Sequence, residues 1–221
     1  VLLALAVFSV RKFATLDGPR VILPLSDGSM FVSLTGRDEV VKLTDANGDG
    51  VAEVTPALRN LDSPHGLALR DGYLYIANTG AVVRAKLDAS GMPDRRVERI
   101  AGYSNGGGHF TRSILFGADD GMYVSIGSSC NLCIETSPDR ATVMRFDANG
   151  GNGRVFSRGL RNAVGMALNP QTRDIWVSQH ERDNLKPDHQ NLPPEEINIL
   201  RDGGDYGWPY CHSDRVPNPE F

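Results

Sequence analysis

The chain has 221 residues, which is enough for one large domain or two small ones. Its 23 basic and 27 acidic residues give a net charge of −4, so nothing in its electrostatics favours nucleic acid or an anionic membrane surface as a partner. Hydrophobic residues make up 40% and charged residues 23%, a balance that excludes a wholly disordered chain. The 24 glycines are scattered between short apolar runs, which favours many tight turns over a helical bundle.

The chain opens on an apolar run, VLLALAVF, that is much shorter than the ~20 residues needed to span a bilayer. We expect residues 1–17 to be either a buried first strand or the remnant of the apolar core of a signal peptide. No other segment is apolar for long enough to be a candidate membrane span.

A repeat organises the rest of the chain. Four times, a short apolar run leads through a turn into a second run, and these second runs close at Ser33, Asn78, Ser125 and Ser178, spaced 45, 47 and 53 residues apart. A further β-type run follows each pair. Strands at this period predict the blades of a β-propeller, because a sandwich of short strands would not explain the regular repeat. We therefore predict an all-β propeller with four-stranded blades at about 18–60, 61–105, 106–158 and 159–221.

Four blades use up the whole chain, whereas a six-bladed ring at this period needs roughly 280 residues. The sequence is thus either a small closed ring or most of a larger one. It starts at Val1 without a methionine and stops at Phe221 in a proline-containing stretch, and these ends favour most of a larger ring.

Propeller geometry predicts which residues share a site. The loop entering each blade and the loop after its second strand gather at one mouth of the central channel, and such loops commonly carry sites. His109, which follows three glycines, is then expected to face Arg161 and Asn162. A guanidinium disfavours charging of a nearby imidazole, which suits a general base, and an Arg–Asn pair can donate hydrogen bonds to ligand oxygens. The alternatives are a structural histidine and an ion pair at the rim.

Cys130 and Cys133 form a C-x-x-C motif, and Cys211 stands alone. Ile134 excludes the C-x-x-C-H pattern of covalent haem attachment, and a zinc ribbon would need a second C-x-x-C. A thioredoxin-like motif would open a helix, whereas a strand and a loop are expected here. We favour a local disulfide, with two reduced thiols as the alternative.

Asp45, Asn47 and Asp49 follow the D-x-N-x-D-G pattern that starts a calcium loop. The twelfth position, where an EF-hand needs a bidentate glutamate, is Pro56. A structural calcium site and a simple hairpin turn are therefore both open.

Five motifs, taken together and in order, resemble the soluble pyrroloquinoline quinone (PQQ)-dependent sugar dehydrogenases, with the sorbosone dehydrogenase-like and aldose sugar dehydrogenase-like branch closest. They are GGHFTR at 107–112, YVSIGSSCNLC at 123–133, GLRN at 159–162, EIN at 196–198 and YGWP at 206–209. The resemblance runs from about Phe8 to Phe221. It implies a six-bladed propeller, of which about two blades are not in this sequence.

The resemblance also implies roles for individual residues. His109 would be the general base that takes the proton of the sugar hydroxyl, and Arg161 and Asn162 would reach the quinone oxygens. Tyr206 would join His109, Arg161 and Asn162 around the cofactor, and His65 would lie near the substrate. The main-chain carbonyls of about Glu181 and Arg182 would hold a catalytic calcium ion. Ser128 stands where glucose-oxidising relatives place an aspartate that orients the base, and the basic residues that clamp the cofactor's carboxylates belong to later blades.

The function implied is oxidation of an aldose or related polyol with PQQ and calcium as cofactors. Electrons would pass to a cytochrome or a quinone, in a protein of the periplasm or one that is secreted. Two alternatives are a calcium-dependent lactonase and a non-catalytic binding propeller. The lactonase would need carboxylates and amides on the channel axis, where the loops entering the blades instead supply Arg20, His65, His109 and Arg161.

Overall fold

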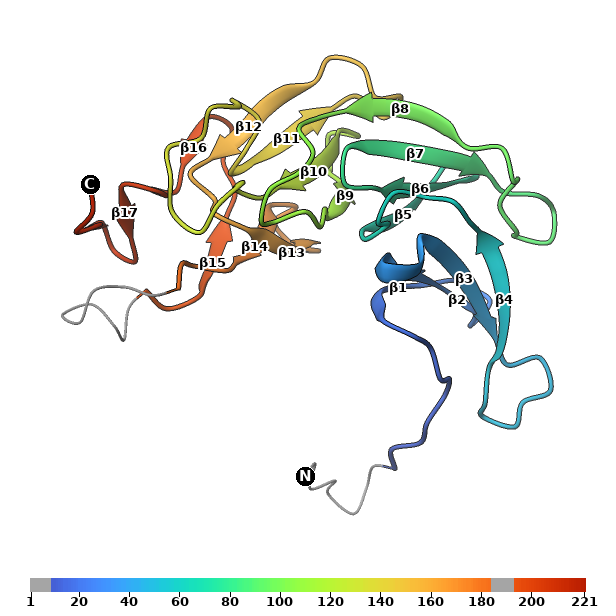
Figure 1. Ribbon diagram of the computed structural model, residues 1–221. Helices are drawn as coiled ribbons and strands as arrows, with labels where there is room; N and C mark the ends of the chain where they lie inside the picture. Colours follow the sequence, from blue (N-terminus) through green and yellow to red (C-terminus); the bar gives the residue numbers. More distant parts are fainter. Residues whose placement is uncertain (1–8, 184–192) are drawn as a thin grey trace.

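Four antiparallel sheets follow one another along the chain and stand side by side around an arc (Figure 1). The computed structural model describes residues 9–183 and 193–221. The first blade contains β1 (Pro19–Pro24), β2 (Met30–Leu34), β3 (Glu39–Thr44) and β4 (Glu53–Leu58), with the short 3-10 helix η1 (Thr35–Arg37) after β2. The second contains β5 (Leu67–Arg70), β6 (Tyr73–Ala77), β7 (Ala81–Lys86) and β8 (Glu98–Gly102).

The third blade contains β9 (Ile114–Phe116), β10 (Met122–Ile126), β11 (Thr142–Phe146) and β12 (Arg154–Arg158), and the fourth contains β13 (Ala163–Leu168), β14 (Ile175–Gln179) and β15 (Glu196–Ile199). In every blade the strands pair in chain order. The innermost strands β1, β5, β9 and β13 contact one another in sequence, so the blades share a common centre. These features confirm the predicted propeller and exclude a sandwich.

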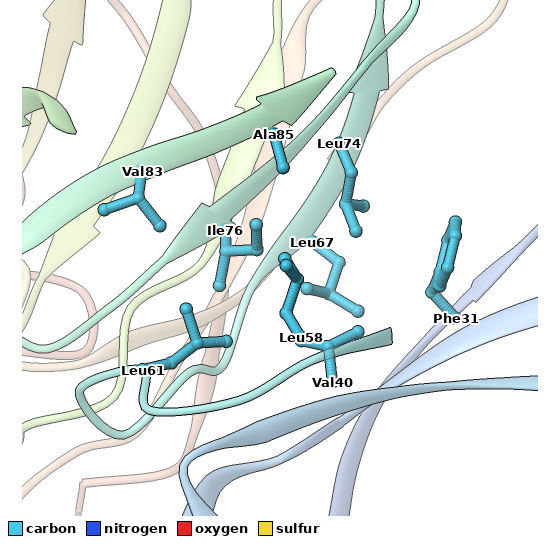
Figure 2. Close-up of a cluster of buried hydrophobic side chains, with 9 residues drawn as sticks. All are labelled: Phe31, Val40, Leu58, Leu61, Leu67, Leu74, Ile76, Val83 and Ala85. Atoms are coloured by element: carbon cyan, nitrogen blue, oxygen red, sulfur yellow. The ribbon is translucent and has the colours of Figure 1, made fainter. Parts of the chain in front are cut away.

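Side chains between the blades form separate apolar cores. Phe31 and Val40 of the first blade pack against Leu74 and Ile76 of the second, and all four are fully buried (Figure 2). Similar clusters join the second blade to the third and the third to the fourth. Each blade is therefore stabilised by its neighbours, because a single amphipathic sheet cannot bury its own faces.

The repeated serines have a structural task. The hydroxyls of Ser33, Ser125 and Ser178 accept hydrogen bonds from the main-chain N–H of Val21, Ser113 and Gly165, at 3.1, 3.0 and 3.0 Å. Each acceptor closes the second strand of a blade, and each donor lies in or beside the innermost strand. The serine thus satisfies an inner-strand amide near the channel, which explains why this residue recurs at the blade period.

The fourth blade differs from the expectation of four strands. Among the described residues its sheet has three, and the next strand, β16 (Gly204–Asp205), pairs in parallel with β12 of the third blade. Gly159 allows this close approach: a Cβ there would lie 2.4 Å from Asp205 Oδ1 and 2.6 Å from the amide nitrogen of Gly207. The short hairpin of β17 (Cys211–His212) and β18 (Val216–Pro217) follows.

Residues 9–17 form no strand, and the expectation for Val1–Phe8 lies outside the described residues. Phe13 nevertheless joins the first blade, because its carbonyl accepts a hydrogen bond of 2.7 Å from the amide of Ala52 and its ring packs against the apolar face of that blade. No helix in the part of the chain that the structure describes is both long and apolar enough to cross a membrane.

Candidate active site

Glycine brings the loop before β9 against the loop after β10. The main-chain N–H of Gly108 donates to the carbonyl of Ser129 at 2.8 Å, and that of His109 donates to the carbonyl of Ser128 at 3.3 Å. Gly107 has a φ of +81°, and a Cβ on it would lie 2.7 Å from Ser129 Cα. Only glycine satisfies both conditions without strain, so it sets the height at which the His109 side chain enters the channel.

The hydrogen bonds of His109 define its tautomer. Its Nδ1 lies 2.9 Å from the carbonyl oxygen of Ser128 and 2.8 Å from the hydroxyl of the same residue. The carbonyl can only accept, and the hydroxyl already donates to the carbonyl of Cys130 at 2.7 Å. The proton is therefore on Nδ1, and Nε2 carries the lone pair, as a general base requires.

The pKa of His109 is lowered from its ordinary value, chiefly because burial disfavours the charged ring. The hydrogen bond to Ser128 opposes this shift, and the positive charge of Arg161 adds to it. The imidazole is therefore neutral at pH 7. This agrees with the expectation that a nearby guanidinium keeps the ring uncharged.

Gly127, directly after β10, lets Asn162 and His109 meet. A Cβ on Gly127 would lie 2.6 Å from His109 Cβ and 2.8 Å from Asn162 Oδ1. The main chain continues this contact, since the amide of Ser128 donates to the carbonyl of Arg161 at 2.8 Å. The structure thus brings His109 and Asn162 together at Gly127, with Arg161 near enough for its charge to act on the His109 ring.

Gly127→Ala should disturb the site because its new methyl group has no room. We expect a loss of unfolding free energy of about 1–3 kcal/mol, measured by chemical denaturation, from the displacement of His109 and Asn162. Gly36→Ala is the matched control, since nothing lies within 4 Å of its Cβ position. Equal unfolding free energies for the two variants would contradict this description of the site.

Arg161 is buried, with 4% of its surface exposed, and its guanidinium is held by oxygen acceptors alone. Nε donates to the carbonyl of Asn131 at 3.0 Å and Nη2 donates to the side-chain Oδ1 of Asn131 at 2.6 Å. Nη1 donates to the carbonyls of His180 at 3.2 Å and Glu181 at 2.6 Å. Burial lowers the pKa of Arg161, while the charges of Asp183 and Glu181 oppose that shift.

His65 occupies the corresponding entrance of the second blade and is buried. Its Nδ1 lies 3.0 Å from the carbonyl of Arg112, so this nitrogen is also the protonated one. Burial lowers the pKa of His65, so this ring is also neutral at pH 7. The fully buried guanidinium of Arg112 donates in turn to the carbonyl of His109 at 2.7 Å. Arg112 thus links the two histidines, and burial lowers its own pKa to about 10.

The loop after β14 offers the oxygen atoms that calcium prefers. The Glu181 carbonyl accepts one bond from Arg161, and the residue's carboxylate is buried beside Gln179, whose Nε2 donates to it. Gln179 Oε1 is fully buried and has no donor among the described residues. An orphaned amide oxygen next to a buried carboxylate is a set of donors that a divalent cation satisfies. The side chains of Gln179 and Glu181 thus offer oxygen donors of the kind that calcium takes, and a calcium site at the main-chain carbonyls of Glu181 and Arg182 remains a prediction.

Burial raises the pKa of the Glu181 carboxyl from 4.5 to about 7, and the hydrogen bond from Gln179 opposes this shift. A folded-state pKa above the unfolded value means that stability is lost as the pH rises from about 4.5 to about 7. In the presence of a chelator we expect the free energy of unfolding to fall by about 1–3 kcal/mol across this window. Glu181→Gln should abolish the fall, whereas the control Glu98→Gln, at an exposed strand position, should keep it. Because the lowered pKa values of His65 and His109 act in the opposite direction, urea titrations at pH 4.5 and 8 compare the parent with Glu181→Gln, and an equal pH dependence of the two would contradict the prediction.

Two further sets of predicted residues lie apart from His109 and Arg161. The Tyr206 hydroxyl donates to the carbonyl of Ile199 at 2.6 Å and accepts from the amide of Arg201 at 2.9 Å, and its ring packs in the core between the third and fourth blades. Its cofactor role remains a prediction that these contacts do not support.

Asp45, Asn47 and Asp49 share the loop between β3 and β4, where the carboxylate of Asp45 accepts hydrogen bonds from the main-chain amides of Asp49 and Gly50. Calcium binding at this loop also remains a prediction.

Cys130 and Cys133 form the predicted disulfide. Among the described residues they also make up, with Glu135, the one cluster of three His, Cys, Asp or Glu side chains whose ligand atoms lie within 4.8 Å. Since both sulfurs are bonded to each other, this cluster is no metal centre. The roles of Asn131, Gln179 and Arg112 were missed by sequence reasoning, although Asn131 lies inside the C-x-x-C motif and Arg112 ends the GGHFTR motif.

Solved structures that resemble this chain include a PQQ domain and a PQQ-bound enzyme. The PQQ domain of pyranose dehydrogenase from Coprinopsis cinerea matches with a TM-score of 0.79 and 23% identity, covering 90% of this chain and 55% of that domain. The PQQ-bound aldose sugar dehydrogenase of Streptomyces coelicolor matches with a TM-score of 0.73 and 19% identity, covering 94% of this chain and 69% of the other. These structures have the same propeller fold.

Sequence similarity defines the family. The model of the TrAA12-like family matches residues 5–219, and the chain belongs to this family. A PQQ-dependent sugar dehydrogenase of Hypocrea jecorina is 29% identical over 133 residues, which are 48% of this chain and 30% of that protein. The family confirms the resemblance to soluble PQQ-dependent sugar dehydrogenases expected from the motifs. The chain spans little more than half the length of several relatives, for example 55% of the Coprinopsis cinerea domain.

Proposed function

We propose that the protein oxidises an aldose or related sugar with PQQ as cofactor. The observation that carries this proposal is the neutral His109, whose protonated Nδ1 is fixed by Ser128 and whose Nε2 is left as a base beside Arg161 and Asn162. Membership of the TrAA12-like family supports the choice of cofactor. The family match places a lactonase second, although a buried carboxylate and amide, Glu181 and Gln179, lie near Arg161.

In this mechanism Nε2 of His109 takes the proton of the hydroxyl on the sugar carbon that is oxidised. The imidazolium that forms is stabilised at Nδ1 by the two oxygens of Ser128, which accept more strongly from a charged ring. Arg161 and Asn162 would donate hydrogen bonds to the quinone oxygens of PQQ, which gain negative charge. His65 would contact the sugar. PQQ, when bound with calcium, supplies the acceptor for the hydride that leaves the sugar carbon. Glu181 and Arg182 would hold the calcium ion through their carbonyls.

We further propose that electrons leave to a cytochrome or a quinone and that the protein works in the periplasm or outside the cell. A disulfide at an exposed loop is consistent with such an oxidising compartment.

Dye-coupled oxidation of a panel of aldoses by the full-length protein tests the proposal. Turnover should require both PQQ and calcium, and a chelator should remove it. Hydrolysis of lactones without PQQ would instead identify a lactonase, and no turnover on either panel would favour a binding propeller.

A further inference from the structure

The four residues closed by the Cys130–Cys133 disulfide lie directly against Arg161. Asn131, inside this ring, supplies two of the four acceptors of the guanidinium: its carbonyl oxygen at 3.0 Å and its side-chain Oδ1 at 2.6 Å. A guanidinium has five N–H groups. Four of them are used by Asn131, His180 and Glu181, which leaves one N–H for a ligand among the contacts of the described residues.

Asn131 also holds the loop that supplies the other two acceptors. Its side-chain Nδ2 donates to the carbonyl of Asp183 at 3.1 Å, and its Oδ1 accepts from the amide of Asp183 at 3.2 Å. This pair of bonds imitates the pairing of two strands. One asparagine therefore contacts Arg161 and, through Asp183, fixes the loop whose carbonyls accept from Nη1.

The disulfide explains how an exposed residue can do this. Asn131 is solvent-exposed and lies in no strand or helix, so packing does not fix its backbone. The link between Cys130 and Cys133 restricts that backbone and keeps both oxygens of Asn131 aimed at Arg161. Preorganised acceptors matter here because a long arginine side chain loses rotamer freedom when it is held in one position.

The same ring reaches the base. The carbonyl of Cys130 accepts the Ser128 hydroxyl proton, which turns the oxygen of that hydroxyl toward Nδ1 of His109. His109 and Arg161 are thus both positioned by the loop that follows β10.

We propose that Asn131 is a positioning residue, and that the Cys130–Cys133 ring presents its two oxygens to Arg161 so that the remaining guanidinium N–H points at the ligand. The inference rests on the proposed function insofar as the ligand is PQQ. The fixing of Arg161 by Asn131 can be observed without any ligand.

The first measurement is the NMR signal of the Arg161 Nη2–H that donates to the side-chain Oδ1 of Asn131, assigned by its absence in Arg161→Lys. In the parent this proton should exchange slowly with water, and in Asn131→Ala its exchange should be accelerated at least 10-fold. Asn131→Asp, which keeps both acceptor oxygens, should restore slow exchange. Asn149→Ala is the matched control, since Asn149 is an exposed asparagine in a turn of the same blade. Unchanged exchange in Asn131→Ala, or equal acceleration in the control, would overturn the proposal.

The second measurement is the dissociation constant of PQQ in the presence of calcium, followed by quenching of protein fluorescence. Asn131→Ala should bind PQQ about 10- to 100-fold more weakly, while the acid limb of the pH–rate profile, which reports His109, should not move. A dithiol reductant, which converts the disulfide to two thiols, should weaken binding in the parent and add little in Asn131→Ala.

The two measurements distinguish the positioning role of Asn131 from the proposed PQQ-dependent function. Accelerated Arg161 exchange in a full-length protein whose parent form does not bind PQQ with calcium would refute the proposed function and leave the positioning role intact. Should Asn131→Ala not fold, Asn131→Leu, which has a similar shape and no side-chain acceptor, replaces it in both experiments.

Discussion

Replacing His109 by alanine is expected to lower kcat for sugar oxidation by about 10²- to 10⁴-fold, the usual contribution of a general base. The reason is geometric: Ser128 fixes the proton on Nδ1, so Nε2 is the atom that can take a proton from the substrate. Dye-coupled kinetics in the presence of PQQ and calcium measure the effect. Added imidazole should restore part of the lost turnover, and the thermal unfolding midpoint shows whether the variant is folded.

The pH dependence of kcat/KM tests whether the neutral form of His109 is the active base. Because the pKa of His109 is lowered from its ordinary value of 6.5, the ring stays neutral at pH 6.5 and above. We expect kcat/KM to fall only at lower pH, where the ring becomes charged. The acid limb should disappear from the residual activity of His109→Ala. A variant with normal turnover and an unchanged pH profile would contradict the role of His109.

Arg161→Ala is expected to lower both stability and cofactor affinity. The free energy of unfolding should fall by about 2–4 kcal/mol, because the carbonyl of the buried Glu181 and that of His180 lose their donor. The affinity for PQQ should fall by at least 100-fold, since a charged donor to the cofactor is lost. Arg161→Lys keeps the charge but not the planar arrangement of donors, so it should recover only part of each loss.

Arg154→Ala is the matched control for this variant. Arg154 makes a two-point ion pair with Asp202, at 2.6 Å for each pair of atoms, but both side chains are about half exposed. Such a pair is worth about 0–1 kcal/mol. If urea denaturation gave Arg161→Ala and Arg154→Ala the same loss, the interpretation of Arg161 as a buried, fully held cation would be wrong.

Much of the architecture could be predicted because the repeat has a local cause. Each serine that marks the period accepts an amide of the inner strand, as Ser125 does from Ser113, so the pattern in the sequence is the pattern of the hydrogen bonds. The position of β16 could not be predicted, because it depends on the space above Gly159 and on the open edge of β12 rather than on its own two residues.

Part of the candidate site could also be predicted from the repeat, and part could not. The meeting of His109, Arg161 and Asn162 follows from the order of strands in a blade, which the repeat predicts. The contacts of Asn131 and the orphaned oxygen of Gln179 depend on how two loops fold against each other, and no periodicity records that. Tyr206 illustrates the converse: its motif is typical of the family, but its hydroxyl is occupied by the main chain between two blades.

The reaction of the PQQ- and calcium-loaded, full-length protein with a sugar in a single turnover tests the central claim most directly. Rapid mixing with an aldose should convert the absorption of the oxidised cofactor to that of the reduced form. The conversion should be slower when the carbon to be oxidised carries deuterium, and it should be nearly abolished in His109→Ala. A cofactor spectrum that stays unchanged with every sugar tested would contradict the assignment of this propeller as a sugar dehydrogenase.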